Sequence, residues 1–319
     1  MRKNRNSARV ASRVALLAVL FFAGVCVRRA SAQGTGASPA AFTHAAVRQI
    51  TATQAAEKEV TVFGQKIRYV EAGSGPVVVL LHGLGGNSTN WAFNIPALAQ
   101  KYRVVVPDQI GFGRSDKPLV NYRVGTYADF LDKFLDELKI EKAALVGNSM
   151  GGWIAALYTL QHPSRVERLV LVDAAGFRPP KEFDLATLSG LNPSTREGMK
   201  RLAGMVFFNP LLKSDAAIDL MLTQRLSAGD GYTIQSLVES IYRGEDMLDG
   251  RLSAIKQPVL LIWGREDGLT PLAREGAQFQ KELAGARLVV LDNCGHVPQV
   301  EKAAEFNAAV LAFLAAETK

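Results

Sequence analysis

The sequence predicts an α/β protein with a doubly wound, mostly parallel sheet and a helical insertion. Continuous apolar runs such as residues 76–81, 103–107 and 259–264 are typical of strands buried on both faces of a parallel sheet. These runs alternate with segments of helical spacing, and strand–helix alternation favours parallel strands joined by helical crossovers. The alternation stops between residues 177 and 253, which we expect to form a helical insertion after the strand that follows the nucleophile helix.

The N-terminal residues 1–32 have the pattern of a secretory signal peptide. Five basic residues within residues 1–13 precede an apolar run over residues 14–27, and Ala30-Ser31-Ala32 has the small residues of a cleavage site. The run is shorter than the about 20 residues that a membrane span needs. We therefore expect cleavage after Ala32 and export, either periplasmic or secreted. Arg28 and Arg29 interrupt the pattern, so an uncleaved N-terminal anchor is the alternative.

The basic excess of the chain lies in this segment. Residues 1–32 hold seven of the 37 basic residues and none of the 30 acidic ones, so the rest of the chain is balanced in charge. A high pI therefore gives no reason to expect a nucleic-acid partner. Cys294 is the one cysteine outside residues 1–32, which excludes an intramolecular disulfide. Four histidines without a His-Glu-x-x-His motif or paired cysteines predict no metal site.

The remaining elements can be taken in chain order. Residues 33–56 are expected to form a flexible leader, and residues 57–176 and 254–319 to form the core. Two short strands are expected between residues 59 and 71, and further strands at 76–81, 103–107, 143–146, 168–173, 259–264 and 287–291. Helices are expected at 91–99, 126–138, 153–160 and 303–314. In the insertion, proline turns separate amphipathic segments such as 199–208 and 214–226, which we expect to cover the carboxyl edge of the sheet as a lid.

The motif Gly147-Asn148-Ser149-Met150-Gly151 stands between a predicted strand and a predicted helix. Such a tight strand-to-helix turn strains the backbone at its apex, and the flanking glycines give it room. The serine hydroxyl is then held at the carboxyl edge of the sheet, beside the amides of the helix N-terminus. We therefore predict that Ser149 is a nucleophile.

A serine hydroxyl needs a base to take its proton and an acid to orient that base. His296 follows the last predicted strand, so it lies at the same carboxyl edge and is the candidate base. Asp267 follows the preceding strand, 259–264, and is the preferred acid. Asp173, at the end of strand 168–173, and Glu266 remain rivals, whereas Asp292 would reach His296 only by an awkward local turn.

The oxyanion of an acyl-transfer intermediate needs fixed donors, for which we predict the backbone amides of Met150 and Leu84. His82 is expected to hydrogen-bond neighbouring loops rather than to take part in the chemistry. The glycine-rich loops do not complete a Gly-x-Gly-x-x-Gly motif, since Ser88 and Asp116 stand at the third glycine, so no dinucleotide cofactor is expected. Five apolar residues of the insertion either line an acyl pocket or form its packed face: Met199, Met205, Phe207, Phe208 and Leu211.

Together these motifs resemble the α/β-hydrolase superfamily over residues 59–316. His82-Gly83, Gly147 to Gly152, the Asp267 loop and Gly295-His296 follow in that family's order. Within it, residues 82–91 and 145–156 are similar to bacterial lipases and carboxylesterases of the cold-adapted lipase group. This resemblance implies an α/β-hydrolase fold, a lid, an ester substrate and no cofactor.

The function expected from these observations is an exported serine hydrolase that cleaves carboxylic esters by way of an acyl-enzyme. Its expected partner is a small-molecule or lipid ester, with no nucleic acid and no stable membrane span in the mature form. The alternative is a hydrolase of carbon–carbon bonds in aromatic ring-fission products, which shares Gly-Asn-Ser-Met-Gly-Gly but commonly carries tryptophan where this chain has Val297. A cofactor-free haloperoxidase-like member and a non-catalytic ligand-binding protein are further alternatives.

Overall fold

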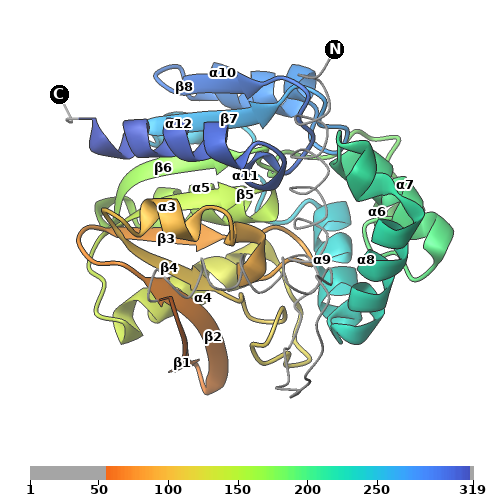
Figure 1. The fold of residues 1–319 in the computed structure, drawn as a ribbon, viewed down its shortest axis with the longest axis horizontal. Helices are drawn as coiled ribbons and strands as arrows, with labels where there is room; N and C mark the ends of the chain where they lie inside the picture. Colours follow the sequence, from red (N-terminus) through yellow and green to blue (C-terminus); the bar gives the residue numbers. More distant parts are fainter. Residues whose placement is uncertain (1–54, 317–319) are drawn as a thin grey trace, which may run out of the picture.

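The computed structural model describes residues 55–316, which build one eight-stranded sheet of order β1-β2-β4-β3-β5-β6-β7-β8 (Figure 1). The first pairs, β1 with β2 and β2 with β4, are antiparallel, and all later pairs are parallel. The strands are β1 (Ala56–Val62), β2 (Gln65–Ala72), β3 (Val77–Leu81), β4 (Arg103–Pro107), β5 (Ala143–Asn148), β6 (Val166–Val172), β7 (Val259–Gly264) and β8 (Arg287–Leu291). The predicted doubly wound, mostly parallel sheet is therefore confirmed.

Helices cover both faces of the sheet. Successive strand residues point to opposite faces, so Val79 and Leu81 of β3 pack on one side while Val78 and Leu80 pack on the other. The first face carries α4 (Val124–Glu137), α5 (Met150–Gln161) and α10 (Ala277–Glu282), and the second carries α3 (Ile95–Leu98) and α12 (Ala303–Ala315). Shorter helical turns are η1 (Ser88–Trp91), η2 (Pro163–Arg165), η4 (Leu252–Ala254), η5 (Leu272–Gly276) and α11 (Pro298–Glu301). Burial on both faces explains the continuous apolar runs of the sequence.

The antiparallel hairpin at the start of the sheet turns at Phe63 and Gly64, which both have positive φ. Residue 56, predicted as the last of the leader, is instead the first residue of β1. The predicted signal peptide, residues 1–32, and leader residues 33–54 lie outside the described residues.

The single helix predicted over residues 91–99 is wrong. The chain forms η1, which ends at Trp91, and then a separate α3 that begins at Ile95. Proline fits only the first turn of a helix because it has no N–H to donate. Pro96 therefore lies in the first turn of a new helix rather than inside a continuous one.

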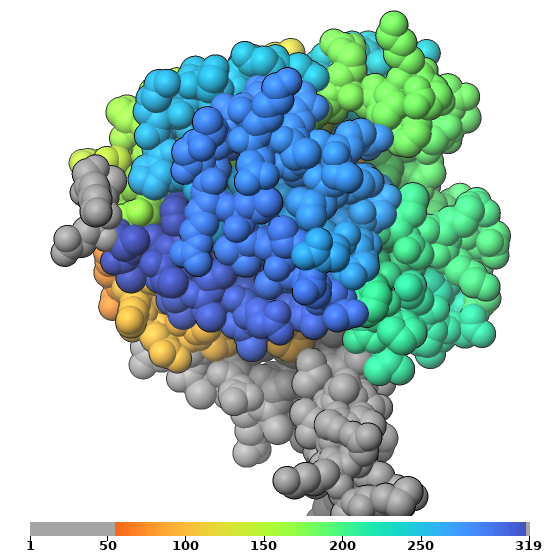
Figure 2. Space-filling model, turned by 90° about the horizontal axis from the view of Figure 1, so that it is seen from above, coloured from red at the N-terminus to blue at the C-terminus, as the bar shows by residue number. Residues whose placement is uncertain are grey.

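The insertion between β6 and β7 is helical, as expected. It contains α6 (Leu185–Ser189), α7 (Arg196–Val206), η3 (Pro210–Lys213), α8 (Asp215–Ser227) and α9 (Gly231–Arg243). These helices gather at one end of the sheet in Figure 1, and Figure 2 shows the green-to-teal insertion beside the blue C-terminal part of the core. That the insertion acts as a lid stays a prediction. Within residues 55–316, no helix combines the length and apolar character that crossing a membrane requires.

Candidate active site

Ser149 occupies the turn between β5 and α5, with φ 56° and ψ −120°. A non-glycine residue with positive φ is strained, and such strain is concentrated at functional sites. The turn is too tight for side chains on either side. A Cβ at Gly147 would lie 2.2 Å from the Gly151 carbonyl oxygen, and a Cβ at Gly151 would lie 2.2 Å from that of Leu81. The glycines of the motif therefore let the helix start directly at the end of the strand.

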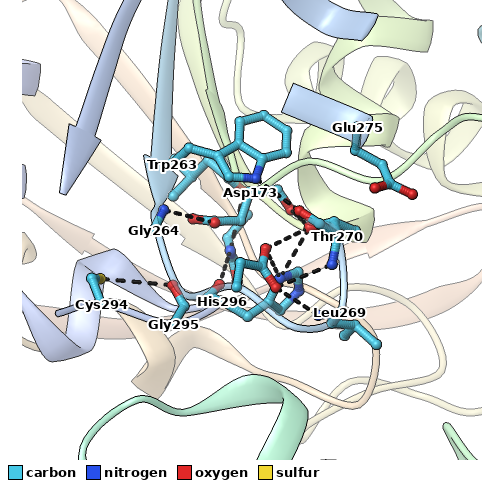
Figure 3. A network of polar contacts seen from close by, with 12 residues as sticks. Asp173, Trp263, Gly264, Leu269, Thr270, Glu275, Cys294, Gly295 and His296 are labelled. Atoms are coloured by element: carbon cyan, nitrogen blue, oxygen red, sulfur yellow. Dashed lines mark hydrogen bonds and ion pairs between the residues drawn. The ribbon is translucent and has the colours of Figure 1, made fainter. Parts of the chain in front are cut away.

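His296 and Asp267 form a buried hydrogen-bonded pair, with 2.8 Å between His296 Nδ1 and Asp267 Oδ2. The other carboxylate oxygen accepts the amides of Leu269 and Thr270, and the Thr270 hydroxyl lies 2.7 Å from Oδ2 (Figure 3). Burial raises the pKa of Asp267, but the charge of His296 and hydrogen bonds from His296, Asp173 and Thr270 outweigh it and lower that pKa to about 2. Asp267 is therefore ionised and supports a positive charge on the imidazole.

The second ring nitrogen of His296, Nε2, is buried and has no hydrogen-bond partner among the described residues. His296 and Ser149 line the same cavity. The amide of Asn148 donates to the carbonyls of Val172, at 3.1 Å, and His296, at 3.0 Å, and thereby ties the nucleophile turn to the histidine loop. The structure thus brings Ser149, His296 and Asp267 together and leaves Nε2 able to accept a proton.

Asp173, a rival for the acid, lies directly behind this pair and is fully buried. Its Oδ1 accepts the Gly264 amide at 2.9 Å. Burial, and then the negative charge of Asp267 and the hydrogen bond to it, raise the pKa of Asp173 well above its usual range. Burial beside the Asp267 carboxylate thus favours the protonated, neutral form of Asp173.

The other rival acids point elsewhere. Glu266 accepts the amide of Cys294 at 2.9 Å, and the exposed Asp292 pairs with Arg265. Cys294 itself is buried, and this burial raises the pKa of its thiol. Of the acids considered from the sequence, Asp267 is the one hydrogen-bonded to His296.

Asp173, Asp267 and His296 also bring three potential metal-ligand atoms within 4.8 Å of one another. In this arrangement His296 Nδ1 already bonds to Asp267, and both oxygens of that carboxylate accept hydrogen bonds. His296 Nδ1 and both Asp267 oxygens are thus already hydrogen-bonded within the protein, as in an acid–base pair.

The loop opposite Ser149 is held by His82. Burial lowers the pKa of His82, and its Nε2 accepts the backbone amide of Gln109 at 3.0 Å, so the neutral ring carries its proton on Nδ1. Nδ1 then donates to the Gly83 carbonyl oxygen at 2.8 Å. His82 therefore hydrogen-bonds neighbouring loops, as expected. Leu84 lies in the cavity wall and Met150 begins α5, while their role as oxyanion donors stays a prediction.

A cavity of about 220 Å³ lies between the core loops and the insertion. Met199 and Phe207 line it, whereas Met205, Phe208 and Leu211 are partly exposed on the surface of the insertion. The aliphatic part of the wall consists mainly of Leu84, Leu191, Leu202, Ala203, Val206, Met221, Leu269 and Val297. The cavity is thus suited to a largely apolar group next to Ser149.

One charged residue, Arg225 of α8, also lines this cavity. Burial lowers its pKa to about 10, so it stays protonated at neutral pH. It pairs with Asp230, and the side chains of Arg225 and Asp230 are 10% and 1% exposed. The wall therefore contains a positive charge that an internal carboxylate balances.

Sequence reasoning missed three residues that support the site: Asn148, Thr270 and Glu301. Thr270 stands three residues after Asp267, a spacing typical of a side chain that caps a turn, and this spacing was the available signal. Asn148 lies inside the nucleophile motif. Glu301, whose carboxylate accepts the Gly295 amide at 2.6 Å, carries no comparable sequence signal.

Comparison with known proteins agrees with this architecture. The family model described as the alpha/beta hydrolase fold matches residues 76–303. The chain belongs to the α/β-hydrolase fold family. The superfamily resemblance of the sequence is therefore confirmed.

The relatives of this α/β hydrolase are named for different activities. The chain is 34% identical over 266 residues to 2-hydroxymuconate semialdehyde hydrolase of Pseudomonas sp. strain CF600. The match covers 81% of this chain and 93% of the relative. A meta-cleavage product hydrolase from Pseudomonas fluorescens IP01 has a TM-score of 0.71 at 30% identity, covering 81% and 97% of the two chains. A membrane phospholipase A has a TM-score of 0.72 at 30% identity, covering 86% and 91%.

Proposed function

We propose that this α/β hydrolase cleaves a bond to a carbonyl carbon, with Ser149 as nucleophile, His296 as base and Asp267 as the acid that orients it. The observation that carries this proposal is the buried His296–Asp267 hydrogen bond, whose free Nε2 shares a cavity with Ser149. His296 takes the Ser149 proton as Oγ attacks the carbonyl and then delivers it to the leaving group. Water, activated by the same base, releases the acyl group. The amides of Leu84 and Met150 are the proposed oxyanion donors.

For the substrate class, we propose an aldehyde or ketone whose carbon–carbon bond at the carbonyl carbon is hydrolysed, as in products of aromatic ring fission. This is supported by similarity to the 2-hydroxymuconate semialdehyde hydrolase and to the meta-cleavage product hydrolase. The proton from His296 goes to the leaving carbon, and the carbonyl side leaves as a carboxylic acid. Arg225 in the cavity wall offers a positive charge to the carboxylate of such a substrate.

A carboxylic ester is the second candidate substrate, as the sequence motifs suggested. It is supported by similarity to the membrane phospholipase A and by the largely aliphatic cavity wall. Val297 follows His296 at the position where carbon–carbon hydrolases commonly carry tryptophan. Asp230 also balances the charge of Arg225, which favours an uncharged substrate.

The two classes can be separated by direct competition. Turnover of 2-hydroxymuconate semialdehyde would be compared with hydrolysis of p-nitrophenyl esters from acetate to palmitate, for the wild type and Ser149→Ala. We expect the larger kcat/KM for the carbon–carbon substrate, and loss of both activities in the variant. An ester preference of about tenfold or more, which corresponds to about 1.4 kcal/mol in the barrier, would select the second candidate. Folded wild-type protein that a fluorophosphonate fails to label would overturn the serine mechanism itself.

We also propose that the protein is exported and cleaved after Ala32. The support lies in the sequence of residues 1–32: a basic start, an apolar run and a small-residue cleavage site. N-terminal sequencing of protein expressed in a Gram-negative host should find Gln33 as the first residue. Protein that keeps residues 1–32 and sediments with membranes would instead support an uncleaved anchor.

A further inference from the structure

Glu301, the last residue of α11, joins the histidine loop to the insertion. Its Oε2 accepts the amide of Gly295 at 2.6 Å and that of Phe208 at 3.3 Å, and its Oε1 accepts the amide of Asn209 at 2.7 Å. Gly295 directly precedes His296, whereas Phe208 and Asn209 follow α7 of the insertion. A single carboxylate therefore bridges two segments that are about 90 residues apart in the chain.

Backbone hydrogen bonds reinforce this bridge at the end of α7. The His296 amide donates to the Val206 carbonyl at 2.7 Å, and the Gly268 amide donates to the Met205 carbonyl at 3.0 Å. The last carbonyls of a helix have no partner within the helix and must find donors elsewhere. Here the donors are His296 and the residue after Asp267. The C-terminal end of α7 thus holds both loops of the acid–base pair.

The two segments are packed too closely to move independently. A Cβ at Gly295 would lie 2.3 Å from the Val206 carbonyl oxygen and 2.9 Å from the Phe208 nitrogen. Only a glycine therefore permits this approach of the histidine loop to α7. A shift of residues 205–209 would consequently displace the backbone that carries His296.

We propose that Glu301 is a positioning residue that couples the insertion to His296. While its carboxylate accepts amides from both segments, the insertion holds the imidazole against Asp267, and movement of residues 205–209 moves His296. Hydrogen bonds to a charged acceptor are about twice as strong as those between neutral groups. One carboxylate can therefore hold both segments in place. The proposal rests on the proposed function in one respect, the role of His296 as the base.

The test uses Glu301→Gln, which keeps the shape of the side chain but replaces one acceptor oxygen with an NH₂ group facing amide donors. Glu305→Gln, the same change at an exposed position of α12, is the matched control. In Glu301→Gln we expect kcat to fall about 10- to 100-fold, because a misplacement of about 1 Å has effects of this size. KM should stay within about threefold, as for a group that acts on the transition state rather than on substrate binding.

Hydrogen–deuterium exchange provides a second measurement that does not depend on activity. Glu301→Gln should exchange faster at residues 205–209 and 293–297 together, with the rest of the chain unchanged. Glu301→Asp, which keeps the charge, should recover part of both kcat and protection. Unchanged kcat and exchange in Glu301→Gln would overturn the proposal, as would faster exchange throughout the chain, which indicates a general loss of stability.

If the variant does not fold, hydrogen–deuterium exchange of the wild-type protein tests the coupling instead. Amides exposed by one shared opening have the same protection factor, so residues 205–209 and 293–297 should be equally protected. Clearly different protection of the two segments would overturn the coupling. Failure of the proposed function is distinguishable, because it would appear as wild-type protein without fluorophosphonate labelling, whatever its exchange pattern.

Discussion

Asp267 accepts hydrogen bonds from the His296 ring, from the Thr270 hydroxyl and from the backbone amides of Leu269 and Thr270. Thr270→Val removes this hydroxyl at nearly constant volume. A hydrogen bond to a charged group is worth about 1.5–3 kcal/mol, and three donors remain, so we expect kcat to fall by about tenfold. Steady-state kinetics with Thr270→Ser, which keeps the hydroxyl, should give nearly wild-type kcat. Equal losses in the two variants would contradict this role.

Asp173 gives folding stability an unusual dependence on pH. Its pKa is raised in the folded protein, so above the unfolded value of about 3.9 the unfolded chain loses a proton that the folded chain keeps. Stability from this group is therefore complete below about pH 3.9 and is lost as pH rises towards the folded pKa, by up to about 1.4 kcal/mol per pH unit.

Asp173→Asn removes this proton while keeping a neutral side chain of similar shape. The free energy of unfolding of the variant minus that of the wild type should therefore increase from pH 5 to pH 7, because only the wild type loses stability through this group. Urea unfolding at both pH values measures the difference. A difference between variant and wild type that is the same at both pH values would show that Asp173 is ionised in the folded protein.

Some residues of the site could be predicted and others could not, for a physical reason. Ser149 and His296 stand after predicted strands, and the carboxyl ends of parallel strands meet at one edge of a sheet. Asn148 and Glu301 act through bonds to His296 and Asn209, which are far away in sequence. Such contacts depend on how loops pack and leave no pattern along the chain.

At the scale of elements, strands were predicted better than helices. Strands β4, β7 and β8 have the predicted bounds because each is a short apolar run between polar turns. The segment 91–99 has helical composition throughout, but Pro96 divides it. Helix α9 was not predicted individually, although its buried residues Ile234, Leu237 and Val238 stand at helical spacing in the sequence. The order of the strands follows from the crossover connections and was not predicted.

Within α7, Gly204 is exposed, and an added Cβ would have no atom within 4 Å. Glycine in a helix is less favourable than alanine by about 0.5–1 kcal/mol. Gly204→Ala should therefore raise the free energy of unfolding by up to about 1 kcal/mol, as measured by thermal or urea unfolding. Gly295→Ala is the opposite control, since its Cβ would meet the Val206 carbonyl, and it should destabilise the protein. A destabilised Gly204→Ala would contradict this description of α7.

At the scale of the whole molecule, the insertion and the core share a buried apolar cluster. Met199, Phe207 and Ile218 of the insertion pack with Val297 and Val300 of the core. Burial of apolar surface across this boundary links the stability of the two parts. We therefore expect them to unfold together rather than one after the other.

The distribution of tryptophan makes this expectation easy to measure. All three tryptophans, Trp91, Trp153 and Trp263, lie outside the insertion. The Trp153 indole donates to the Asp246 carbonyl of the insertion, so a Trp153→Phe variant, which keeps Trp91 and Trp263, gives a fluorescence signal from the core. Far-UV circular dichroism also detects the helices of the insertion. Urea transitions from the two signals should coincide, as in a two-state transition. A circular dichroism transition that precedes the fluorescence change would mean that the insertion unfolds by itself.

The thiol of Cys294 can report on opening of the loop that carries His296. The sulfur is buried two residues before His296 and close to the Gly295 carbonyl (Figure 3), and a chain that lacks residues 1–32 has no other thiol. A disulfide reagent such as Ellman's reagent reaches this sulfur only when the loop opens, because the thiolate is the reacting form and burial disfavours it. The rate of colour release from native protein would therefore report how readily this loop opens, in the absence of any substrate.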